Sequence, residues 1–224
     1  MKKLSIAIVM MTFLVFVGSS WATQITIDRV SGYYSGNGGE FNIVGFGAAT
    51  NSLYASSALS NNGFESFCLE KDEYVSIPGS YNAELNAKNQ VWTGGNNTNL
   101  GDNISRGTAF LYYQFSQGTL SDYDYGAGRS TSAGLLQNTI WFLEEEIDSL
   151  KSNVFTALLI TRFGSLANAQ LDIDMNYGVG VLNLTARNGG LAQDQLVRTP
   201  VPELGTIFLL GLGLLGIGLL RRKK

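Results

Sequence analysis

The middle of the chain contains, at residues 131–147, the stretch TSAGLLQNTIWFLEEEI, which decides how this region folds. Its apolar residues at helical spacing are Leu136, Ile140, Leu143 and Ile147. Residues three and four positions apart share one face of a helix, so the stretch predicts a helix that buries this face. Thr131 or Ser132 is expected to cap its N-terminus, because a hydroxyl oxygen at that position accepts a backbone N–H.

Two further helices are predicted on either side of this one. Ile104, Leu111 and Phe115 recur at helical spacing, which indicates a helix over residues 104–116 that ends before Gly118. A shorter helix is expected over residues 152–163, where Gly164 ends it. The centre of the chain is therefore predicted to be helical.

Stretches with the period of a β-strand lie before and after these helices. They cover residues 24–30, 41–46, 64–70, 171–181 and 193–198. The clearest is residues 171–181, where every odd position is apolar, as in a strand with one buried face. The sequence thus predicts an α+β domain over residues 23–198, with strands at both ends around a middle of two or three helices.

The polar positions of residues 171–181 also have the spacing of calcium ligands. They are Asp172, Asp174 and Asn176. Tyr177 stands where an EF-hand loop requires glycine, and the solvent side of a strand already explains polar residues at this spacing. We therefore expect no metal here, with calcium as the alternative.

The composition excludes several classes of function. Histidine does not occur among the 224 residues, which excludes Ser–His hydrolases and zinc sites built on histidine. Residues 23–200 carry 9 Lys and Arg residues against 17 Asp and Glu residues, a net charge of −8, which argues against a nucleic-acid partner. The single Cys68 cannot form an intramolecular disulfide. We expect no cofactor and no enzyme.

The first 22 residues have the layout of a bacterial signal peptide. Lys2 and Lys3 precede an apolar run over residues 4–17, and the small residues Ser20 and Ala22 stand where signal peptidase reads its substrate. Cleavage is expected between Ala22 and Thr23. The alternative is an uncleaved anchor, although the apolar run is short for a membrane span.

The last 26 residues, 199–224, form a second targeting segment. An uncharged apolar run over residues 204–220 is expected to be a transmembrane helix. The basic residues that follow it are Arg221, Arg222, Lys223 and Lys224. Because such a cluster stays on the cytoplasmic side, residues 23–198 are expected to lie outside the inner membrane.

This tail resembles the PEP-CTERM sorting signal of Gram-negative bacteria. The resemblance rests on Val201, Pro202 and Glu203, followed by the apolar span and the basic stop, with Leu204 where most members have proline. It implies processing by exosortase, a membrane-embedded protease or transpeptidase. It also implies association with exopolysaccharide or a biofilm matrix, at the cell surface or outside the cell.

Two short segments of the domain resemble the signature segments of bacterial thioester domains. They are FCLE at residues 67–70, with Cys68, and LQNTIW at residues 136–141, with Gln137. The family has a Cys at a strand end and a Gln near a helix start, whose side chains condense into a thioester. A thioester is electrophilic, so the resemblance implies covalent attachment to an amine or hydroxyl on a partner. The alternative is a buried, inert Cys68.

Trp141 and the three glutamates after it have ordinary alternatives as well. Trp141 lies one helical turn after Gln137, so it either shields a thioester from water or packs in the core. The residues 144–146, all Glu, are expected to form a solvated acidic face.

Three classes of function remain open from the sequence. The expected one is an exported surface or matrix protein, with the Cys68–Gln137 thioester as its means of attachment. A purely structural matrix protein without a reactive bond is the first alternative. An enzyme that acts on polysaccharide through carboxylates, for example Glu70 and Glu73, is the least favoured, because no paired acid and base is evident.

Overall fold

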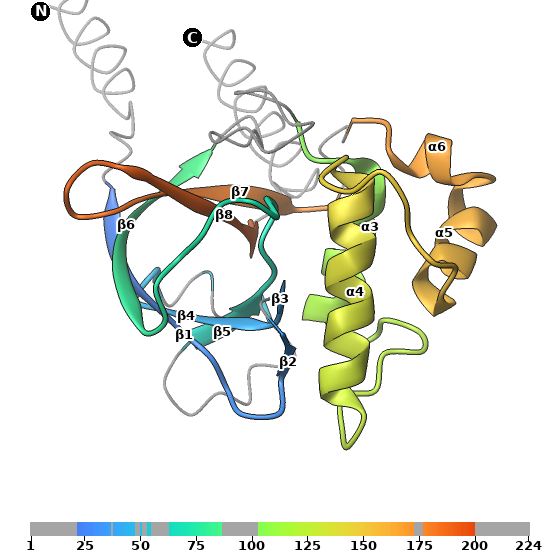
Figure 1. Ribbon diagram of the computed structural model, residues 1–224, viewed down its shortest axis with the longest axis horizontal. Helices are drawn as coiled ribbons and strands as arrows, with labels where there is room; N and C mark the ends of the chain where they lie inside the picture. Colours follow the sequence, from blue (N-terminus) through green and yellow to red (C-terminus); the bar gives the residue numbers. More distant parts are fainter. Residues whose placement is uncertain are drawn as a thin grey trace, which may run out of the picture.

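The computed structural model describes residues 22–36, 38–47, 50, 53–54, 63–86, 103–172 and 177–199. Within this part of the chain, strands at both ends enclose a helical middle, so the predicted α+β class is confirmed. Figure 1 shows the two halves side by side, a curled sheet next to a group of helices.

Six strands form one antiparallel sheet in the order β5-β4-β1-β6-β7-β8. Their bounds are β1 (Thr23–Asp28), β4 (Phe41–Val44), β5 (Gly63–Ser66), β6 (Gly79–Asn86), β7 (Val179–Thr185) and β8 (Leu191–Arg198). The sheet curls until its two edges meet, because Leu69 N donates to Asp194 O at 3.1 Å and Leu196 N to Phe67 O at 3.1 Å. A short hairpin of β2 (Tyr34–Ser35) and β3 (Gly38–Gly39) lies beside it.

The helices are α3 (Arg106–Ser116), α4 (Arg129–Leu143), α5 (Val154–Phe163) and α6 (Leu166–Ala169). Helices α3, α4 and α5 lie over the predicted ranges. Ser105 caps α3 by accepting Thr108 N, and Asn153 forms a capping box at the start of α5. Figure 1 shows α4 standing against β2 and β3, with which it makes its main contacts.

The predicted cap of α4 is wrong. The helix begins at Arg129 with Gly128 as its N-cap, so Thr131 and Ser132 lie inside the first turn. The reason is a turn built by Asp124, whose carboxylate accepts Gly126 N at 2.7 Å and Gly128 N at 2.8 Å. Asp124 thereby satisfies the backbone just before the helix, and a hydroxyl cap is not needed.

The predicted solvated acidic face is also wrong. Glu144 and Glu146 are buried, and Glu145, with a φ of 60°, is the exposed one. Helix α4 stops at Leu143, so the three residues leave the helical period. Glu144 then accepts Ser105 N at 3.1 Å and Glu146 accepts Lys71 N at 3.0 Å, which joins the end of α4 to two distant segments.

The predicted strand over residues 171–181 is confirmed at residues 179–181, which lie in strand β7, while residues 173–176 lie outside the described residues. Strand β7 begins at Val179, and Leu171 is exposed instead of buried. Residues 179–184 of β7 are all buried, and α3 packs against this strand. Both faces of this strand are therefore buried. The strict alternation of apolar and polar residues ends at Val181, which is followed by Leu182.

Both targeting segments lie outside the described residues. This holds for residues 1–21 of the predicted signal peptide and for residues 200–224, which include Val201, Pro202, Glu203 and the basic cluster. Across the segments that the structure does describe, no helix has the length and apolar character needed to cross a membrane. Strand β1 begins at Thr23, directly after the predicted cleavage point at Ala22.

Candidate functional site

The structure brings Cys68 and Gln137 into contact, although they are 69 positions apart in the chain. The sulfur of Cys68 lies 3.3 Å from Oε1 of Gln137. Both residues are buried, with exposed fractions of 0% and 1%. The two residues singled out by their resemblance to thioester signature segments therefore form one buried pair.

Cys68 lies where the two edges of the curled sheet meet. It forms an antiparallel bridge with Gln195 of β8. The flanking hydrogen bonds run from Leu69 and Leu196, so Cys68 and Gln195 are a non-hydrogen-bonded pair, the kind in which facing side chains are closest. The backbone N–H and C=O of Cys68 consequently point away from β8.

The carboxamide of Gln137 occupies that outward edge of Cys68. Its Oε1 accepts Cys68 N at 3.3 Å, and its Nε2 donates to Cys68 O at 2.8 Å. Oε1 also accepts Gly39 N at 3.3 Å. Two backbone N–H groups thus converge on the amide oxygen, which is the arrangement that stabilises negative charge on an acyl oxygen.

Two glycines allow helix α4 to come this close to β3. A Cβ at Gly38 would lie 2.5 Å from Cγ of Gln137 and 3.0 Å from the ring of Trp141, so a larger residue does not fit. Gly39 has a φ of 90°, a conformation that residues with a side chain rarely adopt. The pair Gly38–Gly39 therefore permits the close approach that holds the Gln137 amide.

A buried ion cluster fixes the start of the same helix. Arg129 donates from Nε and Nη2 to the two oxygens of Glu40, each at 2.7 Å, and from Nη2 to Glu65 at 3.0 Å. Desolvation lowers the pKa of Arg129, but the hydrogen bonds to Glu40 and the nearby carboxylates outweigh it and raise the pKa overall. Glu40 directly follows Gly39, and Glu65 lies on β5, three residues before Cys68. The cluster therefore ties the start of α4 to the two segments that contact Gln137.

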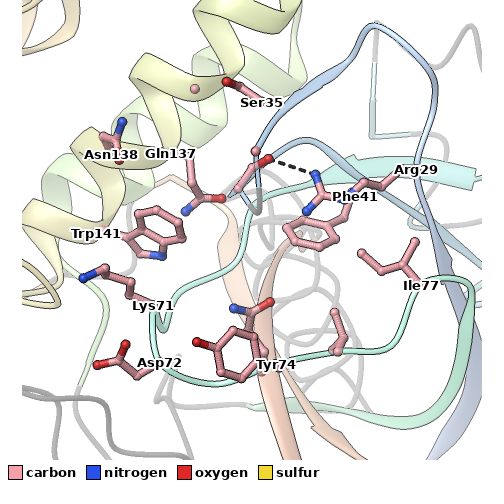
Figure 2. A pocket seen from close by; sticks show the side chains of 15 residues that line it. Arg29, Ser35, Phe41, Lys71, Asp72, Tyr74, Ile77, Gln137, Asn138 and Trp141 are labelled. Carbon is pink, nitrogen blue, oxygen red and sulfur yellow. Dashed lines mark hydrogen bonds between the residues drawn. The ribbon is translucent and has the colours of Figure 1, made fainter.

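A cavity of about 430 Å³ opens beside Gln137. Its wall includes Arg29, Phe41, Lys71, Tyr74 and Trp141 (Figure 2). Figure 2 shows Gln137 and Trp141 projecting from the same helix toward this space, with Arg29 and Phe41 on the opposite side. Gln137 therefore lines the cavity, whereas Cys68 does not.

The surroundings of Cys68 disfavour a free thiolate. Burial raises the pKa of the thiol, and the charge of Glu70 raises it further, while Arg29 acts in the opposite direction. A thiol that stays protonated is a poor nucleophile and oxidises slowly. A thioester, which is uncharged, loses nothing by burial in the same place.

Trp141 is partly buried, packs against the hydrophobic core and also lines the cavity. Its indole N–H faces the thiol and lowers the pKa of Cys68. Sulfur is a weak acceptor, and among the described residues the N–H has no regular hydrogen-bond partner.

Gln195 is a second buried amide beside Cys68 that the sequence reasoning missed. It is fully buried, and neither its Oε1 nor its Nε2 has a hydrogen-bond partner within the described residues. Gly39 and Arg29 were missed as well. No local signal marks these three residues, because their importance comes from segments far apart in the chain that meet only in the folded protein.

The remaining candidate residues are Asp172, Asp174, Asn176, Glu70 and Glu73, of which the structure describes Asp172, Glu70 and Glu73. Asp172 accepts a hydrogen bond from Asn103 at 3.2 Å, while Asp174 and Asn176 lie outside the described residues. No group of three or more possible metal ligands occurs in the described part of the chain. Glu70 and Glu73 do not line the cavity.

Comparison with protein-family models, curated proteins and solved structures found no match.

Proposed function

We propose that this chain is an exported, exosortase-sorted protein of the cell surface or extracellular matrix that attaches to partners through a Cys68–Gln137 thioester. The observation that supports the thioester is the 3.3 Å contact between Cys68 Sγ and Gln137 Oε1, with two backbone N–H groups on the same oxygen. A buried Cys and a buried Gln meet in this way beside a cavity that reaches the amide.

The thioester forms when the sulfur of Cys68 replaces the amide nitrogen of Gln137. The sulfur of Cys68 attacks Cδ of Gln137, and charge develops on Oε1, where the N–H groups of Cys68 and Gly39 stabilise it. The C–N bond then breaks, and the amide nitrogen leaves as ammonia with the thiol proton. The product is a thioester whose carbonyl oxygen keeps both hydrogen bonds.

Attachment is the second half of the same chemistry. An amine that enters the cavity attacks Cδ of Gln137, the C–S bond breaks, and an amide to the partner forms. The proton of the amine ends on the sulfur, so Cys68 returns as a thiol. Because burial disfavours a departing thiolate, the bond stays latent until a nucleophile is held against it.

The mass of the intact protein tests the thioester. The protein with its C-terminal segment, purified in detergent, is expected to weigh one ammonia less than calculated for the chain that begins at Thr23, and peptide mapping should join Cys68 to Gln137. Cys68→Ala and Gln137→Glu should both have their full calculated masses and take up no methylamine. Gln195→Leu is the matched control, since it removes the other amide beside Cys68 and should keep the deficit. A wild-type protein of full mass with an alkylatable Cys68 after denaturation would contradict the proposal.

The sorting part of the proposal rests on the two terminal segments. The signal-peptide layout ends at Ala22, and the first strand starts at Thr23. Deletion of residues 201–224 should release the protein into the medium, because the apolar span and its basic stop are lost. Unchanged retention by cells would count against the sorting role.

The second candidate is a structural matrix protein without a reactive bond. It is favoured by the fact that the Gln137 amide satisfies both backbone groups of Cys68, which ties α4 to the sheet without any covalent chemistry. The mass measurement separates the two candidates. An enzyme acting on polysaccharide would instead release products, and Cys68→Ala would leave that release intact.

A further inference from the structure

We infer that the cavity beside Gln137 selects nucleophiles that also carry a carboxylate, which it holds between Arg29 and Lys71. This inference rests on the proposed thioester, since it names the class of ligand that the thioester captures.

The cavity has the opposite charge to the domain around it. Its charged wall residues are Arg29, Lys71 and Asp72, a net charge of +1. Residues 23–200 as a whole carry −8. A hollow with a net positive charge attracts anions, so an anion that reaches this domain is drawn to the cavity.

Arg29 is held in a fixed position for such a contact. Its Nη1 donates to Gly38 O at 2.8 Å, and its guanidinium lies 4.2 Å from the ring centre of Phe41. Figure 2 shows the guanidinium on the cavity wall across from Trp141. A guanidinium that is fixed in this way loses little freedom when it binds a carboxylate, which it matches in shape.

Arg29 also lies close to the reacting atoms. It binds the carbonyl of Gly38, and the next residue, Gly39, donates to the oxygen of Gln137. A carboxylate bound at Arg29 therefore places a nucleophile a few bonds away near Cδ of Gln137. The rings of Trp141 and Tyr74 supply apolar wall for the carbon chain that joins the two ends.

Lys71 and Asp72 form the exposed rim of the cavity. Lys71 adds the second positive charge, whereas Asp72 opposes binding of an anion. Substitution of Lys71 makes the cavity less positive and substitution of Asp72 makes it more positive, and neither change alters Gln137.

The amine of the ligand attacks Cδ of Gln137, the C–S bond breaks, and an amide forms. The displaced proton ends on the Cys68 thiol, and the carboxylate of the ligand is unchanged. No oxidant, reductant or co-reactant is needed.

The test uses two probes that differ only in the anionic group, 4-aminobutyrate and 4-aminobutanol. Each is incubated with the full-length protein in detergent, and the rate of adduct formation is followed by intact mass. We expect 4-aminobutyrate to react at least about tenfold faster, the effect of one charge-assisted contact. The preference should decrease at high salt, because Lys71 is exposed.

Variants locate the preference in the cavity. Lys71→Gln and Arg29→Gln should each reduce the ratio of the two rates toward one, and Asp72→Asn should increase it. Lys151→Gln is the control, because it removes an exposed positive charge that does not line the cavity, and it should leave the ratio unchanged. The ratio is the measured quantity because it cancels any effect of a variant on the thioester itself.

The results distinguish this inference from the proposed function. If methylamine reacts but 4-aminobutyrate reacts no faster than 4-aminobutanol, the thioester stands and the selectivity is overturned. A preference that Lys151→Gln reduces as much as Lys71→Gln also overturns it, because the charge of the whole domain would then explain it. If no amine reacts and no ammonia is missing from the mass, the proposed function fails and the inference fails with it.

Discussion

The backbone N–H of Gly39 donates to Oε1 of Gln137 at 3.3 Å, across 98 positions of the chain. This oxygen also accepts Cys68 N, so hairpin β2–β3, helix α4 and the segment after β5 meet at one acyl oxygen. Both distances exceed the 2.7–3.1 Å typical of a working oxyanion site. The contacts are expected to shorten as charge develops on the oxygen.

Gly38→Ala should prevent thioester formation without unfolding the domain. The new Cβ would lie 2.5 Å from Cγ of Gln137, so the side chain of Gln137 has to move away from Cys68. We expect the intact mass to rise to the full calculated value while the circular dichroism spectrum is retained. Gly190→Ala, in the turn between β7 and β8, is the control and should keep the missing ammonia. A deficit that survives Gly38→Ala would show that this close approach is not required.

The stability of the protein should decrease as the pH rises from about 4.5 to 7. Burial raises the pKa of Glu144 to about 7, so the folded state favours the protonated acid more than the unfolded state does. Glu144 therefore stabilises the folded state fully below its unfolded pKa of 4.5. This stabilisation is lost as the pH rises through 7, and the free energy of unfolding decreases by at most about 3 kcal/mol.

Glu144→Gln isolates this effect, because burial also raises the pKa of Glu40. The amide imitates the protonated acid and still accepts Ser105 N. Urea unfolding of both proteins should give similar free energies at pH 4.5, whereas the variant should be the more stable at pH 8. Parallel curves over this range would mean that Glu144 does not titrate there.

The sequence predicts the helices well because their signals are local. The apolar spacing of Leu136 and Ile140 needs only its own segment to indicate a buried face, and both residues are buried. The start of α4 was missed because Asp124, outside the helix, replaces the expected hydroxyl cap. Local patterns therefore locate a helix and its buried face more reliably than they identify the residue that caps it.

The site divides in the same way. Cys68 and Gln137 were found through short segments that resemble a known pair, but Gly39, Gln195 and Arg29 carry no such pattern. The burial of Glu146 likewise depends on the backbone N–H of Lys71, 75 positions away. Contacts of this kind come from the meeting of the sheet edges, which no single segment of the sequence specifies.

Arg129→Met should strongly destabilise the fold. The change leaves Glu40 and Glu65 buried without their guanidinium, and breaking a buried ion pair on one side costs about 3–5 kcal/mol. Thermal unfolding should show a large decrease in Tm. Arg187→Ala, on an exposed turn, should change the free energy of unfolding by less than about 0.5 kcal/mol. Equal effects of the two variants would refute the structural role of the cluster.

Gln195→Leu should leave the protein as stable as before or make it more stable. Both amide atoms of Gln195 are buried without partners in the described structure, and an unsatisfied buried group costs about 1–3 kcal/mol. Leucine has a similar size and no polar atoms. Chemical unfolding measures the difference, and a loss of more than about 1 kcal/mol would mean that the amide has a partner, such as a bound water.

Trp141→Ala should make the thioester less durable. The indole lines the cavity next to Gln137, so its removal admits water and amines to Cδ more freely. Methylamine should be taken up faster, and the missing ammonia should disappear from the mass during storage as water hydrolyses the bond. Trp141→Phe keeps an aromatic ring but removes the N–H, so it separates shielding from any effect of the indole donor on the sulfur. If shielding dominates, Phe preserves the bond and Ala does not. If both variants lose it equally, the N–H facing Cys68 is the group that matters.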